Sequence, residues 1–301
     1  MHIIAANNAV YALSAAKKPV LEVEPGATVV FETMDCFSNQ ITDESQLFAS
    51  VGWATINPAT GPLAVQGARP GQTLVVEIVN IQTAEQGVMV AVPDMGVFGK
   101  KLTHSETKVV PIRDGKAVFD DKLSLPLAPM IGVIGTAPPA ETGAVPCGTP
   151  GPHGGNMDTR LIGKGARVYL PVFVEGALLS LGDLHAVMGD GEVVICGVEI
   201  AGQVTVRVDV AKTPFAGPVV ETQEHWHFIA SAETLDEAAE AAAHAALDVL
   251  AKALPIPVNH VGMLLSVAGN LAISQIVDPL RTARMSVPKS VLTAYGAKLG
   301  A

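Results

Sequence analysis

CGTPGPHGGNMDTR (residues 147–160) and GDLHAVMGDGEVVICGVEI (residues 182–200) are the stretches around which this chain is organised. Among glycines, they concentrate the side chains that carry out acid–base or metal chemistry: His153, Asn156, Asp158, Asp183, His185, Asp190, Glu192 and Glu199. Glycine lets the backbone turn sharply and approach a ligand closely. Imidazole beside carboxylate is typical of divalent metal sites and of proton-transfer sites. We therefore expect two strand-bearing halves to hold these residues rigidly over a small pocket.

The composition is that of a strand- and turn-rich globular protein. The 301 residues are 49% hydrophobic and 16% charged, with 29 glycines and 21 prolines, whereas disorder requires low hydrophobicity and high charge. Aromatic residues make up only 4%, which argues against stacking platforms for single-stranded nucleic acid. The net charge of -10 opposes phosphate backbones and anionic lipid surfaces. We expect neither nucleic acid nor a membrane as a partner.

Cysteine usage and the N-terminal residues indicate a cytoplasmic protein. Cys36, Cys147 and Cys196 are an odd number without a CxxC pair, so no disulfide framework is expected and a reducing compartment is the default. The opening residues, MHIIAANNAVYAL, contain neither the basic region of a signal peptide nor a long apolar run. A chain with so few charges often hides apolar surface between subunits, and we therefore expect a homo-oligomer, a dimer or higher.

The first part of the chain, residues 1–220, is predicted to be a β-rich body that carries the active-site motifs. Pro-Gly and Asp-Gly turns separate short runs of β-branched and apolar residues, which is the pattern of stacked antiparallel sheets. The expected strands include residues 20–23, 28–34, 74–81, 109–112, 117–119, 167–173, 193–198 and 203–210. Residues 135–155 form a long Gly/Pro/Thr loop, and loops of that length are usually functional or disordered.

The pattern changes near the C-terminus, where residues 221–301 are predicted to form a small α/β portion. Residues 221–228 are one more expected strand. The run TLDEAAEAAAHAALDVLAKAL then predicts a long helix over about 234–253, since Thr234 and Glu237 form a capping box. A shorter helix over 259–267 and a strand over 271–277 follow. The predicted fold is α+β and mainly β, with a β-sandwich-like body; the two parts either form separate units or pack as a single domain.

Several long motifs resemble the acetamidase/formamidase family. They are NPATGPLAVQGARPGQTLVVEI (57–78), PHGGNMD (152–158), GDLHAVMGDGEV (182–193) and NLAISQIVDP (270–279). The match extends along nearly the whole chain, and the spacing of the second and third motifs is specific. The resemblance implies a mainly β fold, hydrolysis of short aliphatic amides such as formamide or acetamide to the carboxylate and ammonia, a divalent metal and a homo-oligomer.

Amide hydrolysis needs an activated nucleophile, and the residues favour a metal-activated water. Paired serines in a Gly/Ser-rich loop and a GxSxG elbow are both absent, while a thiolate at Cys147 stays open as an alternative. Zinc is the favoured ion, with calcium or another divalent ion as an alternative. The predicted ligands share a position at a strand end or beside glycine: Asp35, His153, Asp158 and His185. Asp183 is either a ligand, on the same strand face as His185, or a turn former.

Three further residues are predicted to be catalytic. Glu199 lies in an apolar run, where burial raises a carboxyl pKa, and with Glu192 it is a candidate proton shuttle. Asn156 could donate a hydrogen bond to the oxyanion of the tetrahedral intermediate. The alternatives to the metal-dependent amidase are hydrolysis through Cys147, and a non-catalytic protein that binds a small ligand on the same scaffold.

Overall fold

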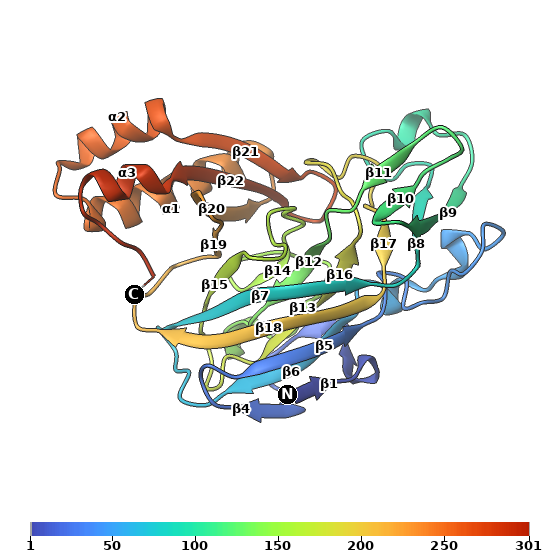
Figure 1. Cartoon of the computed structure of the whole chain (residues 1–301), viewed down its shortest axis with the longest axis horizontal. Helices are drawn as coiled ribbons and strands as arrows, with labels where there is room; N and C mark the ends of the chain where they lie inside the picture. Colours follow the sequence, from blue (N-terminus) through green and yellow to red (C-terminus); the bar gives the residue numbers. More distant parts are fainter. Residues whose placement is uncertain (1, 301) are drawn as a thin grey trace.

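The structure is a computed structural model that describes residues 2–300. Two large sheets are stacked, and Figure 1 shows β5, β18 and β7 of one sheet in front of β12, β14 and β16 of the other. The nine-stranded sheet has the order β1 (His2–Ile4), β5 (Thr28–Thr33), β18 (Gly202–Ala211), β7 (Thr73–Thr83), β15 (Arg167–Pro171), β19 (Val219–Glu221), β20 (His225–Ala232), β22 (Arg281–Pro288) and β21 (Asn270–Gln275).

The second sheet is eleven-stranded. Its main path runs through β11 (Ser124–Pro126), β10 (Lys116–Val118), β9 (Glu106–Arg113), β8 (Gln86–Ala91), β17 (Glu199–Ile200), β16 (Leu179–His185), β12 (Met130–Gly135) and β14 (Gly154–Asn156). Branching from β16 is β6 (Ala59–Val65), which also pairs with β2 (Ala9–Val10) and β4 (Leu21–Val23). A separate pair joins β3 (Ala12–Leu13) to β13 (Val145–Pro146).

The predicted sandwich-like body with stacked antiparallel sheets is confirmed. Nearly all ladders are antiparallel, the exceptions being β1 with β5 and β4 with β6. The largest apolar cluster draws on both sheets, with Phe31, Ile78 and Val206 from one and Leu63 and Leu181 from the other. Each side chain of this size contributes about 1.5–3 kcal/mol when it is fully buried, so this shared core fixes the position of one sheet against the other.

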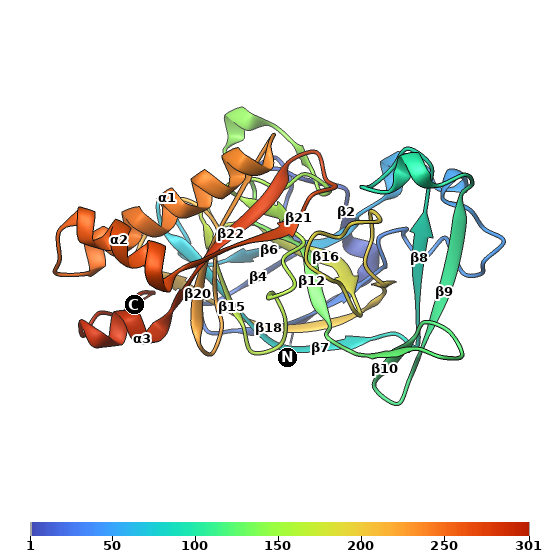
Figure 2. The ribbon, with the colours of Figure 1, turned by 90° about the horizontal axis from the view of Figure 1, so that it is seen from above.

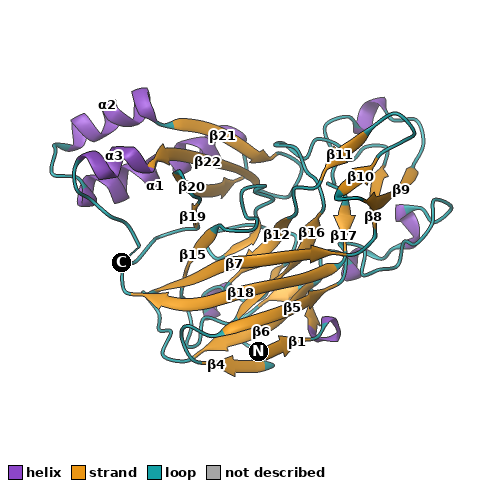
Figure 3. Cartoon of the chain, viewed as in Figure 1, coloured by secondary structure: helices purple, strands orange, loops and turns teal. Residues whose placement is uncertain are grey.

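The predicted long helix is confirmed, and helices gather at one end of the molecule (Figures 2 and 3). α1 (Leu235–Ala253) begins with the capping box of Thr234 and Glu237. Its buried residues are Ala238, Ala242, Ala246 and Leu250; the alanines let the helix pack closely on β20 and β22. α2 (Val258–Ala268) and α3 (Lys289–Ala294) complete this end. The nine-stranded sheet continues unbroken into it through β15 and β19.

Among the described residues, five single-turn 3-10 helices lie in the connections: η1 (Ala6–Asn8), η2 (Phe48–Ser50), η3 (Trp53–Thr55), η4 (Gly99–Lys101) and η5 (Ala140–Thr142). Within residues 2–300, no helix combines the length and the apolar character that crossing a bilayer requires. The three cysteines are free thiols.

Two predicted strands differ from the structure. The strand over 193–198 is wrong, because Glu192 has a φ of 49° and Ile195 a φ of 106°, and the chain turns here; only β17 is extended. The strand over 221–228 is interrupted by a turn in which the Thr222 amide donates to the His225 carbonyl at 2.9 Å. In contrast, the hairpin at Asp114-Gly115 is confirmed, since both residues adopt the positive φ that its turn requires.

Candidate metal and active site

Three strand ends of the eleven-stranded sheet bring the candidate site together. β16 carries Asp183 and ends at His185, and Glu199 of β17 lies directly opposite His185 in the antiparallel ladder. Residues that face each other in such a ladder project to the same side of the sheet. Asp158 lies just beyond β14, which β12 separates from β16 in the sheet, and Glu192 precedes β17. Two motifs distant in sequence therefore meet at one point.

His185 lies at the centre of a group of carboxylates. Its Nε2 atom is 3.1 Å from Glu199 Oε1 and 3.7 Å from Asp183 Oδ1. The same nitrogen is 3.8 Å from Asp158 Oδ1 and 3.8 Å from Glu192 Oε1. All five side chains are buried. We call these five residues, together with the half-buried Asp278 on the β21–β22 loop, the carboxylate cluster.

Mutual repulsion and burial shift the protonation of the cluster. Burial raises the pKa of Asp158 to about 6 and that of Glu199 to about 8. It also raises the pKa of Glu192 well above its usual range. For His185, burial lowers the pKa, but the charges of Glu199 and Asp183 raise it well above its usual range overall. For Asp183, burial raises the pKa, but the neighbouring His185 ring and the Asn57 amide outweigh burial and lower the pKa. The carboxyl groups of the cluster can therefore all be ionised at the same time only if a further positive charge lies beside them.

The donor atoms fit a bound divalent cation. Buried polar atoms normally have a hydrogen-bond partner, yet both oxygens of Asp158, Asp183 Oδ1 and Glu199 Oε2 have none among the described residues. Asp158, Asp183 and His185 offer ligand atoms that lie within 4.8 Å of one another. Two further groups share residues with this one and meet the same distance limit: His185 with Glu192 and Glu199, and Asp158 with Glu192 and Asp278. Oxygen and imidazole donors suit both Zn²⁺ and harder divalent ions.

Glycines keep space open around the cluster. A Cβ atom on Gly132 of β12 would lie 2.5 Å from Asp158 Oδ1 and 2.8 Å from Asp183 Oδ2. On Gly197 it would lie 2.8 Å from Cγ and 2.8 Å from Nδ1 of the His185 ring. No side chain fits at either place without displacing a cluster residue.

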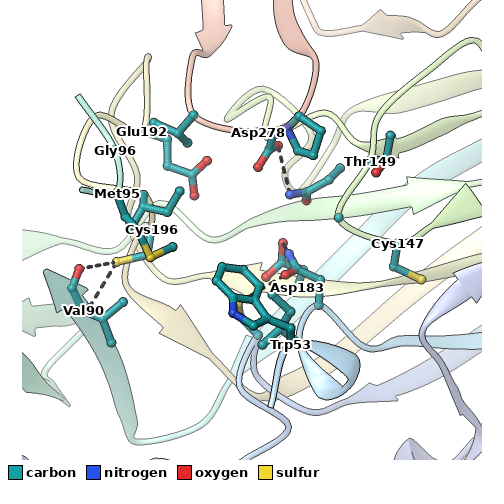
Figure 4. Close-up of a pocket in the computed structure, with 18 of the residues that line it drawn as sticks. Trp53, Val90, Met95, Gly96, Cys147, Thr149, Asp183, Glu192, Cys196 and Asp278 are labelled. Atoms are coloured by element: carbon teal, nitrogen blue, oxygen red, sulfur yellow. Dashed lines mark hydrogen bonds between the residues drawn. The ribbon is translucent and has the colours of Figure 1, made fainter. Parts of the chain in front are cut away.

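The cluster forms part of the wall of a pocket of about 1100 Å³ (Figure 4). Asp183, Glu192, Glu199 and Asp278 line it, whereas Asp158 and His185 belong to the cluster without lining the pocket. Two amide side chains support this wall, as Asn57 Nδ2 donates to Asp183 Oδ2 at 3.0 Å and Asn156 Nδ2 donates to Asp278 Oδ2 at 3.0 Å.

The structure brings five of the seven predicted site residues to this place. Asp158, His185, Glu192 and Glu199 belong to the carboxylate cluster, and Asn156 lines the pocket beside it. Asp35 and His153 are buried but belong to no metal-ligand group among residues 2–300.

The Asp35 carboxylate caps its own loop, accepting the backbone N–H groups of Phe37 at 2.9 Å and Asn39 at 2.7 Å. Burial lowers the pKa of His153 to about 4, and its Nε2 atom has no hydrogen-bond partner among the described residues. A ligand role for these two residues stays a prediction.

Sequence reasoning did not single out two polar residues of the pocket. Asp278 belongs to the NLAISQIVDP motif, but no histidine or glycine pattern marks it there, and it reaches the cluster only through the β21–β22 loop. Asn57 stands in the Asn-Pro turn before β6 and is joined to Asp183 only by the fold. Asp183, weighed between turn former and ligand, lies in the cluster and has a φ of 56°.

The thiols are held in the protonated form. Cys147 Sγ donates to the Val10 carbonyl at 3.4 Å, and burial raises its pKa to about 12. Burial also raises the pKa of Cys196 and, together with the charge of Glu199, that of Cys36, whose Sγ lies within 4.8 Å of ligand atoms of Asp183 and Glu199. The charge of Lys17 lowers the pKa of Cys147, but burial outweighs it, so the structure disfavours a thiolate nucleophile at Cys147.

The histidine pair on β20 has a structural arrangement. The rings of His225 and His227 stack with centroids 5.7 Å apart. His227 hydrogen-bonds through Nδ1 to Ser286 at 2.7 Å and through Nε2 to Thr222 at 3.1 Å. Both ring nitrogens of His227 are thus satisfied without an ion.

Comparisons with known proteins agree with the motifs. A family model described as "Acetamidase/Formamidase family" matches residues 16–145 and 140–292. The crystal structure of an acetamidase from Bacillus halodurans superimposes with a TM-score of 0.96, at 49% identity, covering 98% of this chain and 99% of that one. A formamidase of Methylophilus methylotrophus is 28% identical over 63% of this chain and 61% of its own length.

An acetamidase of Mycolicibacterium smegmatis is likewise 28% identical, over 63% of this chain and 63% of its own length. The chain thus spans under two thirds of these curated relatives.

Proposed function

This chain belongs to the acetamidase/formamidase family, and from that premise we propose that it hydrolyses short aliphatic amides such as formamide or acetamide to the carboxylate and ammonia. The observation that carries the proposal is the convergence of His185 with buried carboxylates, several of which line a pocket. Such a concentration of acids around one imidazole is unfavourable for folding and is kept where chemistry uses it.

Asp158, Asp183 and His185 are the residues we propose to hold a divalent ion, with Glu192 and Asp278 adjoining Asp158. When bound, an ion such as Zn²⁺ polarises the amide carbonyl and lowers the pKa of a water to about 7. Ligation would also supply the positive charge that the carboxylate cluster requires. Zinc is our first candidate, and calcium is the alternative because carboxylate oxygens predominate in the cluster.

Glu199 is the residue we propose to move the proton. Its Oε1 accepts the Gly197 N–H at 3.0 Å and lies 3.1 Å from His185 Nε2, which fixes the orientation of the carboxyl group. Its other oxygen has no partner among the described residues, and the side chain lines the pocket. That oxygen can take a proton from the attacking water and deliver it to the departing nitrogen, which leaves as ammonia.

Asn156 and Glu192 have supporting roles in this proposal. One Nδ2 hydrogen of Asn156 is donated to Asp278, and the other can be donated to the oxyanion that develops on the amide carbonyl. Glu192 is 3.8 Å from His185 Nε2 and lines the pocket, so it serves as ligand or as second proton acceptor.

The test is ammonia release from formamide, acetamide and phenylacetamide by purified protein whose metal content has been measured. We expect activity that is lost on chelation and restored by one added divalent ion. His244→Ala, on the exposed side of α1, is the matched control for His185→Ala, since it removes an imidazole outside the pocket. Metal-loaded, folded protein that binds these amides but releases no ammonia from any of them would favour the binding-protein alternative.

The homo-oligomer and the cytoplasmic location are also part of the proposal. They rest on the low charge content and the cysteine usage of the sequence, and mass measurement in solution tests the first of them.

A further inference from the structure

The pocket is much larger than formamide or acetamide. Its volume is about 1100 Å³, whereas a water molecule occupies about 30 Å³ of the liquid and either amide is only a few atoms larger than water. Pockets of about 300–1,000 Å³ are typical for drug-sized ligands. A site that had to enclose acetamide alone would leave most of this space to solvent.

The space beyond the carboxylate cluster has an apolar wall. The wall consists of Phe37, Phe48, Trp53, Ile56, Val90 and Met95, all of which line the pocket. We call these six residues the apolar wall. They come from two segments, residues 37–56 and 90–95. They share the pocket with Glu199 and with Asp183 and Glu192, which Figure 4 labels together with Trp53 and Met95. A molecule in this pocket would therefore contact both polar groups and an apolar surface.

The apolar wall is backed by its own core. Phe37, Phe48 and Val90 belong to a separate buried apolar cluster that lies under these two segments. Phe48 makes edge-to-face contacts with Phe37 at 6.1 Å and with Trp53 at 5.1 Å between ring centroids. These contacts hold the indole of Trp53 in place although 65% of that residue is exposed. An exposed aromatic ring with a fixed position in a pocket offers a ligand a large apolar contact surface.

The charges around the pocket disfavour an anionic ligand. The acidic residues Asp94, Asp183, Glu192, Glu199 and Asp278 line it, and Arg281 is the one Lys or Arg among the described lining residues. Arg281 already donates to the Asp278 backbone carbonyl. An acyl group with its own carboxylate would be repelled, whereas an uncharged apolar group would not.

We propose that the apolar wall is an acyl-binding subsite and that the preferred substrates are primary amides with an uncharged acyl group larger than acetyl, such as an aryl or branched-alkyl acetamide. The inference rests on the proposed hydrolase function and specifies its substrate class. The amide carbon faces the carboxylate cluster and the acyl group packs on Trp53. Water adds to the carbonyl carbon, the C–N bond breaks, and the products are the carboxylate and ammonium, with no other reactant needed.

The test compares kcat/KM for formamide, acetamide, isovaleramide and phenylacetamide in wild type, Trp53→Ala and Phe119→Ala. Phe119 is 38% exposed and does not line the pocket, so its variant is the matched removal of an exposed ring. We expect wild type to prefer phenylacetamide over acetamide by at least about 10-fold, the lower end of what one apolar contact can discriminate. That ratio should fall about 10-fold or more in Trp53→Ala and stay unchanged in Phe119→Ala.

A second measurement does not depend on turnover. The chain has two tryptophans, and Trp226 is only 5% exposed, so a solvent-sensitive emission signal comes from Trp53. In chelator-treated protein, phenylacetamide should shift that emission to shorter wavelength, and acetamide at the same concentration should not. The shift should be missing in Trp53→Ala.

Three outcomes have distinct meanings. Activity on formamide and acetamide that declines steadily with acyl size, without an emission shift, would overturn the subsite and leave the proposed hydrolase intact. No ammonia from any amide, with metal bound, would defeat the hydrolase itself. A change in the solution mass of Trp53→Ala with an unaltered substrate preference would assign the apolar wall to contact with a second copy and overturn the subsite.

Discussion

Gly132→Ala isolates the geometry of the carboxylate cluster from its chemistry, because it removes no ligand. Gly132 lies on β12, and the added Cβ would lie 2.5 Å from Asp158 Oδ1, 2.8 Å from Asp183 Oδ2 and 2.9 Å from the Asp183 carbonyl oxygen. Ordinary van der Waals contact begins at 3.4 Å. Both carboxylates are buried, and Asp183 is tied to Asn57, so neither can swing away into solvent.

The size of the effect follows from that overlap. One carboxylate must move by about 1 Å, and a displacement of that size costs about 10²-fold in rate where geometry is catalytic. Inserting one carbon into a tight interior also lowers the free energy of unfolding by about 1–3 kcal/mol. We therefore expect a folded protein with reduced metal content and kcat/KM lowered by about 10²-fold.

The assay combines elemental analysis, ammonia release and urea unfolding on the same preparation. Gly262→Ala is the control, since Gly262 lies within α2 with nothing within 4 Å of the added atom; helix propensity predicts a gain of up to about 1 kcal/mol and no change in rate. Wild-type metal occupancy and unchanged kcat/KM in Gly132→Ala would refute the claim that Asp158 and Asp183 act together at one ion.

The remaining predictions concern single side chains. Asp158→Ala should lose most bound metal and activity with the fold retained, and full metal occupancy would remove Asp158 from the ligand set. Cys147→Ala should keep substantial activity because its thiol is buried and protonated; total loss of turnover at normal metal content would favour a covalent route instead. Glu199→Gln should keep fold and metal but lower turnover by about 10²–10⁴-fold, the usual contribution of general acid–base catalysis; an unstable but fully active variant would contradict it. Burial, with smaller effects of His225 and Arg284, lowers the pKa of His227 from 6.5 to about 4. The unfolded chain therefore binds this proton first, and stability falls as pH drops from 6.5 towards 4. The loss attributable to His227 is about 2 kcal/mol between pH 7 and 5, and urea titrations of wild type and His227→Gln at both pH values should differ by that amount.

Local signals in the sequence were sufficient for the regular parts of the fold. The capping box at Thr234 and Glu237 predicts the start of α1 within one residue, because its side chains accept hydrogen bonds from backbone N–H groups that have no partner within the helix. Asp114-Gly115 placed a hairpin turn, since those residues tolerate positive φ. Such signals act over a few residues, and therefore they do not depend on the tertiary contacts of the rest of the chain.

Site residues that lie in dense motifs could be predicted from the sequence. Site residues that reach the cluster one at a time through the fold could not. His185 and Asp158 stand among glycines and acids and were candidates from sequence. Asp278 follows an unremarkable strand, and only the β21–β22 loop returns it to a carboxylate 120 residues earlier in the chain. Asp35 has the sequence signal of a ligand, an acid at the end of an apolar strand, and its Oδ1 accepts backbone N–H groups of its own loop. Composition and periodicity alone do not show that Asp278 belongs to the cluster.

The wrong strand over 193–198 and the carboxylate cluster have one physical origin. Val193, Val194 and Ile195 favour extended backbone, yet Ile195 has a φ of 106°. Asp158, Asp183 and Glu192 have φ values of 40°, 56° and 49°, a region that costs a non-glycine residue about 1–3 kcal/mol. Strain of this kind persists only where the surrounding structure enforces it, and here it aims three carboxylates at one point beside His185. Local preference fails as a guide along this stretch because the fold overrides it to assemble the cluster, which is where such failures are expected when a site is functional.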